Sequence, residues 1–172
     1  MQTSYLDVLH KVHIFSDLDS DQLKLAERIC HEFKALSGER VITEGEKGEG
    51  VFILIEGSVE ISKRLTLLTR GEADTRDKKL IVLRADHESG TYPVFGEMGL
   101  YLTDERSATV TAVSTCTLLE IRSQDWLDLC EKDYKLGYYV TRRLMELVSE
   151  RLRNTNRDVL KLTTALCLAL ES

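Results

Sequence analysis

The distribution of glycine is the feature that most constrains how this chain folds. Nine of the ten glycines fall between Gly38 and Gly99, and they separate short runs rich in β-branched residues. Short apolar runs divided by turn residues at such intervals are typical of a many-stranded β domain. Because most connections are turn-sized, antiparallel pairing in a roll or barrel is expected rather than a parallel sheet.

Seven strands are predicted in this part of the chain. Their bounds are His31–Leu36, Arg40–Thr43, Val51–Glu56, Ser58–Arg64, Lys79–Ala85, Ala108–Val113 and Thr117–Arg122. The polar stretch 70–78 (RGEADTRDK) contains one apolar residue and is predicted to form the mobile tip of a hairpin. The acidic segment Glu44–Gly50 lacks the spacing of an EF-hand calcium loop and is interpreted as a turn between strands.

Helical patterns flank the β zone on both sides. Residues 1–29 predict two short helices, the second with its N-cap near Ser20. After the β zone, an N-cap at Ser123 and a short helix over Gln124–Glu131 are predicted, followed by a long helix from about Tyr134. In a chain of 172 residues this predicts one domain with three segments: N-terminal helices 1–29, a β-roll 30–122 and C-terminal helices 123–172.

The long helix carries an apolar seam that steps by alternating threes and fours. Its members are Tyr138, Thr141, Met145, Val148, Leu152, Thr155, Val159, Leu162, Leu166 and Ala169. Leu144 and Leu147 form a second stripe on an adjacent face, so we expect one face to dock on the chain's own roll while the seam forms a parallel homodimer. The alternative is a single stripe packed in cis. Asn154 and Asn156 are poor helix formers and predict a bend there.

Charge and hydropathy exclude several classes of partner. The chain has 23 basic and 29 acidic residues, a net charge of −6, and no block of lysine and arginine, which argues against direct nucleic-acid binding. The longest apolar runs are Val51–Ile55 and Ala165–Leu170, far short of the roughly 20 residues of a membrane span. With no signal-peptide core at the N-terminus, a cytoplasmic location without membrane contact is expected.

Cysteine and histidine give no sign of a metal site. Cys30, Cys116, Cys130 and Cys167 stand far apart without a C-x-x-C pair, and they are predicted to be reduced thiols, most of them packing groups. Among the histidines only His10 and His13 share a helical face, with no third ligand evident nearby. The H-x-H pair expected of a cupin-type metal enzyme is absent from the sequence. We therefore predict no metal, no catalytic residue and no enzymatic activity.

The segment 95–110 (FGEMGLYLTDERSATV) is the best candidate for a binding site. Gly96 permits close approach of the backbone, and the turn after it presents amide hydrogens at a helix start, where an anion is favoured. Arg106 supplies a planar guanidinium that can hold two phosphate oxygens. Glu97 would repel an anion unless it accepts a hydrogen bond from a neutral hydroxyl, such as that of a sugar.

The order FGEMGL, five loop residues and RSATV resembles the phosphate-binding cassette of the cyclic-nucleotide-binding domain family. Residues 38–42, 44–46 and 51–59 resemble the first strands of that family and their glycine turns. The resemblance covers roughly residues 12–152. It implies a mainly β fold with flanking helices: an eight-stranded antiparallel β-roll (double-stranded β-helix) with N-terminal helices and a long C-terminal hinge helix.

The resemblance also implies roles for individual residues. Gly96 and the amides of Glu97 and Met98 would face the cyclic phosphate, Glu97 would accept from the ribose 2′-hydroxyl, and Arg106 would pair with the phosphate. Ser107 would add a hydroxyl donor. In the family, threonine at that position tends to accompany guanine preference, whereas serine occurs in bacterial cyclic-AMP receptors. The ligand implied is therefore a cyclic nucleotide, with cAMP favoured over cGMP.

The function implied is a cyclic-nucleotide sensor that signals through its C-terminal helix, as a homodimer and with an unidentified protein partner. A base contact is expected near Ser149 or Arg153. The loop 86–94 is longer than the family's usual entry turn; Tyr92 and His87 are candidates to approach the ligand there, although exposed loop positions are favoured for both. The alternatives are a structural dimerisation roll that binds no nucleotide and, less favoured, a cupin-type metal enzyme.

Overall fold

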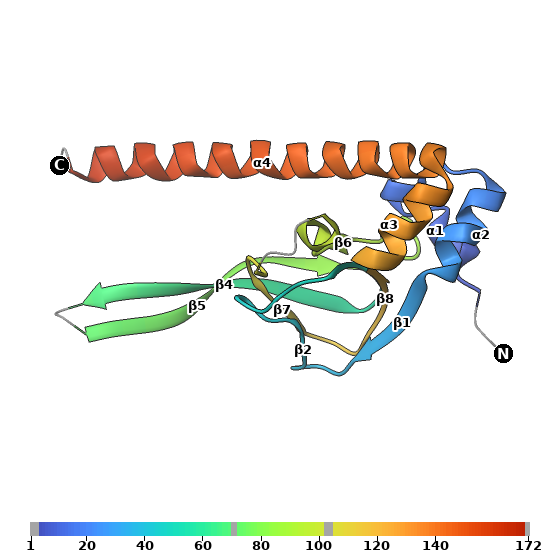
Figure 1. Ribbon diagram of the computed structural model, residues 1–172. Coiled ribbons are helices and arrows are strands. Elements are labelled where there is room, and N and C mark those ends of the chain that lie inside the picture. The colour runs from blue at the N-terminus through green and yellow to red at the C-terminus, as the bar shows by residue number, and fades with distance from the viewer. Residues whose placement is uncertain (1–3, 70–71, 102–104, 171–172) are drawn as a thin grey trace.

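The computed structural model describes residues 4–69, 72–101 and 105–170. Two four-stranded antiparallel sheets, with strand orders β1-β8-β3-β6 and β2-β7-β4-β5, form a roll. The short helices gather at one end of this roll, and a long C-terminal helix runs past it (Figure 1). The predicted fold class, an antiparallel β-roll with flanking helices, is confirmed.

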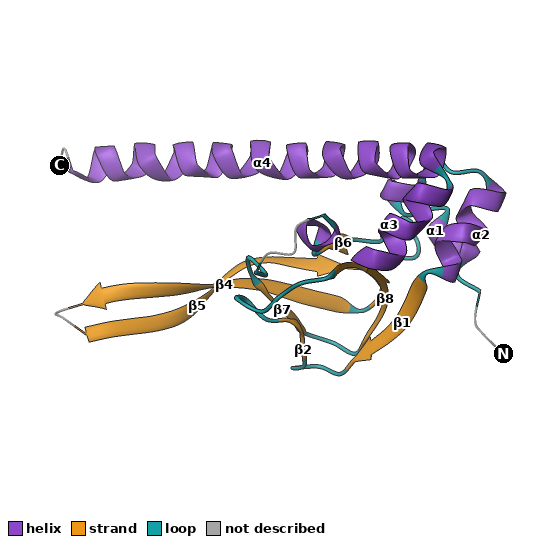
Figure 2. Cartoon of the chain, in the orientation of Figure 1, coloured by secondary structure: helices purple, strands orange, loops and turns teal. Residues whose placement is uncertain are grey.

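The strands are β1 (Cys30–Ala35), β2 (Arg40–Ile42), β3 (Gly50–Glu56), β4 (Ser58–Thr69), β5 (Glu72–Arg84), β6 (Val94–Phe95), β7 (Thr109–Ala112) and β8 (Cys116–Arg122). The helices are α1 (Leu6–Leu9), α2 (Ser20–Arg28), α3 (Ser123–Lys132) and α4 (Tyr134–Leu170), with the 3-10 turns η1 (His13–Phe15) and η2 (Glu97–Leu100). Figure 2 shows the helices lying outside the strands. β6 is the strand that the sequence did not predict, because it has only two residues.

β3 is the central strand of the core, and both of its faces are buried. Val51, Ile53 and Ile55 belong to a cluster shared with the helices. Phe52 and Leu54 belong to a second cluster between the two sheets. Because successive side chains of a strand point to opposite faces, a strand covered on both sides must be apolar at every position. This explains the unbroken apolar run of β3.

The four cysteines are free thiols. Cys116 is fully buried in the cluster between the sheets, which agrees with a packing role. Burial, together with the nearby charge of Glu27, raises the pKa of the Cys30 thiol to about 12. A thiol with so high a pKa stays protonated and unreactive at neutral pH.

β4 and β5 form a much longer hairpin than the sequence predicted. They pair from Ser58 opposite Arg84 out to Thr69 opposite Glu72. The predicted loop is therefore wrong for residues 72–78, which belong to β5, and residues 70–71 lie outside the described residues. A two-stranded ribbon that leaves the core does not need an apolar face. The polar sequence of residues 72–78 therefore lacks the apolar pattern from which strands are predicted. The hairpin projects from the roll in the same direction as the C-terminal half of α4 (Figure 1).

Three local predictions about helices need correction. The N-cap of α2 is Asp19, whose carboxylate accepts from the amides of Asp21 and Gln22 in a capping box, so Ser20 is the first helical residue. α3 begins at Ser123 itself, and no side-chain cap bond forms there. α4 runs without interruption through residues 154–156, so the predicted bend is wrong. Asparagine costs a helix only a few tenths of a kcal/mol, too little to break one of this length.

The buried apolar residues of α4 lie on one face of the helix. Leu136, Val140 and Leu144 are buried in the cluster that β3 shares with the helices, here called the helix-side core, and Leu147 packs against it. Large apolar seam residues of α4 are exposed, at 62% for Met145 and 38% for Val148. The stripe predicted to dock in cis and the predicted seam therefore lie on different faces. Seam pairing with another chain and the three-segment division of the chain stay predictions.

Two arginines fasten α4 to the N-terminal region. Arg143 holds Asp17 with two hydrogen bonds, Nε to Oδ2 at 2.6 Å and Nη2 to Oδ1 at 2.8 Å. Arg142 adds a bond from Nη2 to Oδ2 at 2.7 Å. Hydrogen bonds from Arg143, and then from Arg142, lower the pKa of the Asp17 carboxyl to about 2 from its ordinary 3.8, against the opposing effect of desolvation. The ionised form of Asp17 is therefore stabilised by folding.

We expect Asp17→Asn to lower the free energy of unfolding at pH 7. Because folding depresses the pKa of Asp17, its contribution is complete above about pH 3.8 and is lost as the pH falls through about 2. The difference between variant and wild type should therefore shrink across that interval in urea unfolding curves. Asp158→Asn, which removes an exposed pair with Lys161, is the matched control. An equal difference at pH 7 and pH 2 would contradict this role.

Candidate functional site

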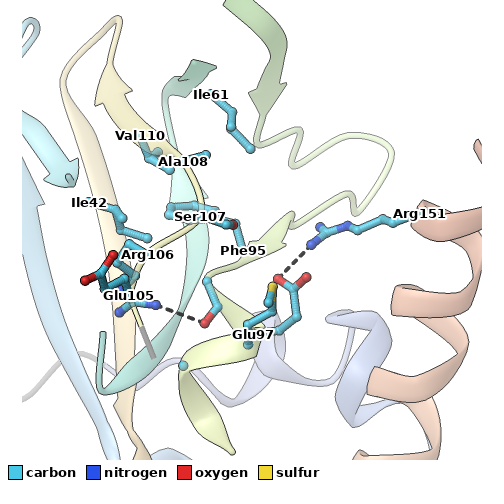
Figure 3. A pocket seen from close by; sticks show the side chains of 13 residues that line it. Ile42, Ile61, Phe95, Glu97, Glu105, Arg106, Ser107, Ala108, Val110 and Arg151 are labelled. Carbon is cyan, nitrogen blue, oxygen red and sulfur yellow. Dashed lines mark hydrogen bonds and ion pairs between the residues drawn. The ribbon is translucent and has the colours of Figure 1, made fainter. Parts of the chain in front are cut away.

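One pocket collects all five residues that the sequence singled out: Gly96, Glu97, Met98, Arg106 and Ser107. Its other lining residues are Ile42, Ile61, Phe95, Gly99, Glu105, Ala108, Val110 and Arg151. The hollow measures about 130 Å³ and lies between the cassette and α4 (Figure 3). Much of its wall is apolar, while two arginines and two glutamates supply its charges, so the pocket suits a ligand with both an apolar part and a polar or charged part.

Gly96 sets the geometry of the pocket entrance. It has a left-handed backbone (φ 76°), which ends β6 and starts the turn η2. A Cβ at this position would also lie 2.9 Å from Nη1 of Arg106. Glycine meets both demands, the positive φ and the close approach. The amides of Glu97 and Met98 stand at the start of this turn, where backbone N–H groups have no intrahelical acceptor.

Arg106 is a half-buried cation packed among glycines. Its Nη1 donates to the carbonyl of Gly50 at 2.9 Å and to that of Gly96 at 3.1 Å. A Cβ at Gly48 would lie 2.1 Å from Nε and one at Gly99 would lie 2.7 Å from Nη1, so larger residues would push the guanidinium away. These glycines therefore fix the position of the side chain at the pocket.

Burial and charge act in opposite directions on Arg106. Burial lowers the pKa of its guanidinium, while the carboxylates of Glu120 and Glu97 raise it. The group remains a cation because arginine does not lose its proton in proteins. Both of its hydrogen-bond partners among the described residues are neutral carbonyls. A partly desolvated cation that faces neutral acceptors is a suitable site for an anion.

Glu97 points into the pocket and is only 13% exposed. Its Oε2 lies 2.7 Å from Nη1 of Arg151, which comes from α4. Nη2 of the same arginine donates to the carbonyl of Val94 at 2.5 Å. In the view of Figure 3, Glu97 stands between Arg106 and Arg151. Ser107 is exposed at the pocket wall, where its hydroxyl is accessible to a ligand.

The base contact predicted near Ser149 or Arg153 stays a prediction, but a different residue of α4 lines the pocket. Ser149 and Arg153 are exposed and do not line the pocket, whereas Arg151 does. Residues two apart on a helix point to opposite sides, so Ser149 and Arg153 lie on the opposite side of α4 from Arg151. The signal was present, because Arg151 follows Leu144 by seven positions and Leu147 by four, on the stripe expected to dock in cis.

The loop before the cassette also differs from expectation. Tyr92 is 6% exposed and belongs to the helix-side core rather than to an exposed loop. Its hydroxyl lies 3.0 Å from Nδ1 of His87, which is exposed. Neither residue lines the pocket. Tyr92 thus contributes to the core.

A short chain of hydrogen bonds joins the cassette to the helices. Tyr101 follows η2 directly, and its hydroxyl accepts from Nε1 of the buried Trp126 in α3 at 3.0 Å. The same hydroxyl lies 2.7 Å from Oγ1 of Thr141 in α4. A displacement of the cassette turn would therefore disturb hydrogen bonds to both α3 and α4.

The described residues contain no group of three or more His, Cys, Asp or Glu side chains placed to hold a metal ion. Over the same residues, no helix has the length and apolar character needed to cross a membrane.

Comparison with known proteins assigns this arrangement to a family. Residues 32–133 match the model of the cyclic nucleotide-binding domain. The cAMP-activated global transcriptional regulator Vfr of Pseudomonas aeruginosa is 31% identical over 134 residues, which are 76% of this chain and 55% of Vfr. The cGMP-dependent protein kinase, isozyme 1, of Drosophila melanogaster is 28% identical over 165 residues, which are 91% of this chain and 20% of the kinase. The chain thus spans about half the length of Vfr and about a fifth of the length of the kinase.

Among solved structures, a cyclic nucleotide-binding domain from Methylobacillus flagellatus superposes with a TM-score of 0.71 at 21% identity. The match covers 90% of this chain and 80% of that one. At this identity the likeness establishes the fold, and the match of residues 32–133 establishes the family. The chain is a member of the cyclic nucleotide-binding domain family.

Proposed function

We propose that this chain is a non-catalytic sensor that binds a cyclic nucleotide, with cAMP favoured over cGMP, and signals through α4. The observation that carries the proposal is the half-buried Arg106 at the pocket, whose hydrogen-bond partners among the described residues are neutral carbonyls. The cyclic phosphate is a permanent anion. An anionic oxygen adds charge–charge attraction to a hydrogen bond from the guanidinium, which a neutral carbonyl cannot supply.

The other cassette groups fit the remaining parts of such a ligand. The amides of Glu97 and Met98 would donate to the phosphate, since they begin a helical turn. The carboxylate of Glu97 would accept from the ribose 2′-hydroxyl. Ser107 would add a hydroxyl donor at the exposed wall of the pocket.

The preference for cAMP is supported by Ser107 and by relatives named as cAMP-activated regulators. A cGMP-dependent kinase is also among the relatives, so the two nucleotides must be compared directly. The contacts of Tyr101 with α3 and α4 support α4 as the output element, because they join the cassette turn to both helices.

Replacement of Arg106 should weaken binding selectively. A charge-assisted bond to phosphate contributes about 1.5–3 kcal/mol, so Arg106→Ala should weaken cAMP binding about 10- to 150-fold by calorimetric titration. Arg64→Ala, at an exposed arginine outside the pocket, should bind as wild type does. Wild type should bind cAMP more tightly than cGMP. Unchanged affinity in a folded Arg106→Ala variant would refute the proposed phosphate site.

Glu97 should read the ribose. Glu97→Gln retains the size of the side chain but is a weaker acceptor, so it should reduce affinity for cAMP more than affinity for 2′-deoxy-cAMP, which lacks the donor hydroxyl. The comparison of the two ligands on one variant cancels general damage to the pocket. Equal losses for both ligands would rule out the ribose role.

The seam of α4 should form a parallel homodimer. Val159 and Leu166 are 55% and 60% exposed, and an apolar strip of this kind is normally an interaction surface. Wild type should sediment as a dimer at tens of micromolar, whereas the double variant Val159→Asp/Leu166→Asp should be a monomer. The matched control is Leu160→Asp/Leu168→Asp, which places the same charges on exposed leucines outside the seam. A monomeric wild type, or dimers in both variants, would refute the seam.

A further inference from the structure

Arg151 is the residue of α4 that reaches the pocket, and it makes two bonds there. Nη1 lies 2.7 Å from Oε2 of Glu97, and Nη2 donates to the carbonyl of Val94 at 2.5 Å. These partners belong to η2 and β6, the two elements on either side of Gly96. Figure 3 shows the side chain extending from α4 toward Glu97. Arg151 thus joins α4 directly to the side chain of Glu97 in the cassette and to the backbone of Val94 just before it.

The position of Arg151 along α4 is also particular. From residue 152 to residue 170 every residue of the helix is exposed, whereas Arg151 is half-buried. The docked part of α4 therefore ends at the pocket. Contact between helix and roll at this point depends on polar bonds, because Leu152 is 59% exposed and contributes no core packing.

Glu97 poses an electrostatic problem for an anionic ligand, and Arg151 relieves it. A carboxylate that is 13% exposed would repel a cyclic phosphate in the same pocket. Pairing with a guanidinium offsets most of the field of Glu97, so this carboxylate opposes the attraction between Arg106 and the phosphate less. The pair engages Oε2, and a carboxylate can accept further hydrogen bonds, so Glu97 can keep this partner while it accepts from a hydroxyl.

We propose that Arg151 is a positioning residue for nucleotide binding: it holds the Glu97 carboxylate toward the ribose and neutralises it against the phosphate. The inference rests on the proposed function, since it assigns Glu97 to the ribose hydroxyl. Arg151 acts through Glu97 and needs no contact of its own with the ligand. α4 thereby becomes part of the binding site as well as its output.

The test is calorimetric titration of five variants with cAMP and 2′-deoxy-cAMP: Arg151→Ala, Arg151→Lys, Arg153→Ala, Glu97→Gln and the double variant Glu97→Gln/Arg151→Ala. Arg151→Ala should weaken cAMP binding about 10-fold, the smallest effect expected for loss of a charge-assisted bond, and should weaken 2′-deoxy-cAMP binding less. Arg151→Lys should recover part of the affinity, because lysine keeps the charge but not the planar fork. Arg153→Ala, at an exposed arginine two positions away, is the matched control and should match wild type. In a Glu97→Gln background, Arg151→Ala should cost little more.

The outcomes separate this role from its alternatives. Tighter cAMP binding by Arg151→Ala would show that the ion pair competes with the ligand, and it would overturn the inference. Unchanged binding, equal losses for the two ligands, or full additivity with Glu97→Gln would overturn it as well. In those cases a loss of affinity in Arg106→Ala would leave the proposed function standing. A wild type that binds neither nucleotide would overturn both proposals.

Discussion

The guanidinium of Arg106 is the group on which the arrangement of the pocket depends. It lies across three segments at once, because Nη1 bonds the carbonyls of Gly50 in β3 and of Gly96 before η2, while Arg106 itself precedes β7. β3 can supply that carbonyl at a fixed place because its side chains are buried on both faces. A cation in such a place loses hydration, which the carboxylates of Glu120 and Glu97 offset in part and an anionic ligand would offset further.

α4 is attached to the rest of the chain at two kinds of contact with different sensitivities. Near its start, buried leucines and the Asp17–Arg143 bonds fix the helix. None of these residues lines the pocket. Eight residues further on, Arg151 binds Glu97, which points into the pocket. The first contact makes the helix a permanent part of the fold. The second contact holds the distal part of the helix more weakly, because polar bonds at a half-exposed position break at small cost.

The sequence predicted the features that rest on local pattern and missed those that rest on tertiary context. Glycine spacing and apolar alternation found seven of the eight strands, and the cassette motif brought together the five pocket residues. The hairpin strand at 72–78 was missed because a ribbon outside the core has no apolar face to detect. Arg151 was missed because no motif fixes the register of a hinge helix, although the spacing from Leu144 and Leu147 contained that register.

Thermodynamic linkage couples ligand affinity at the pocket to the docking of α4 if one residue takes part in both. If Arg151 orients Glu97 for the ligand, then bound ligand must stabilise the docked position of α4 by the same free energy that docking adds to binding. Helix residues 152–170 are exposed and do not pack on the core. A partner that pairs with the seam there would therefore affect the position of Arg151. Association through the seam and nucleotide affinity are then coupled in one sign: a partner that favours the docked helix tightens binding, and one that pulls it away weakens binding.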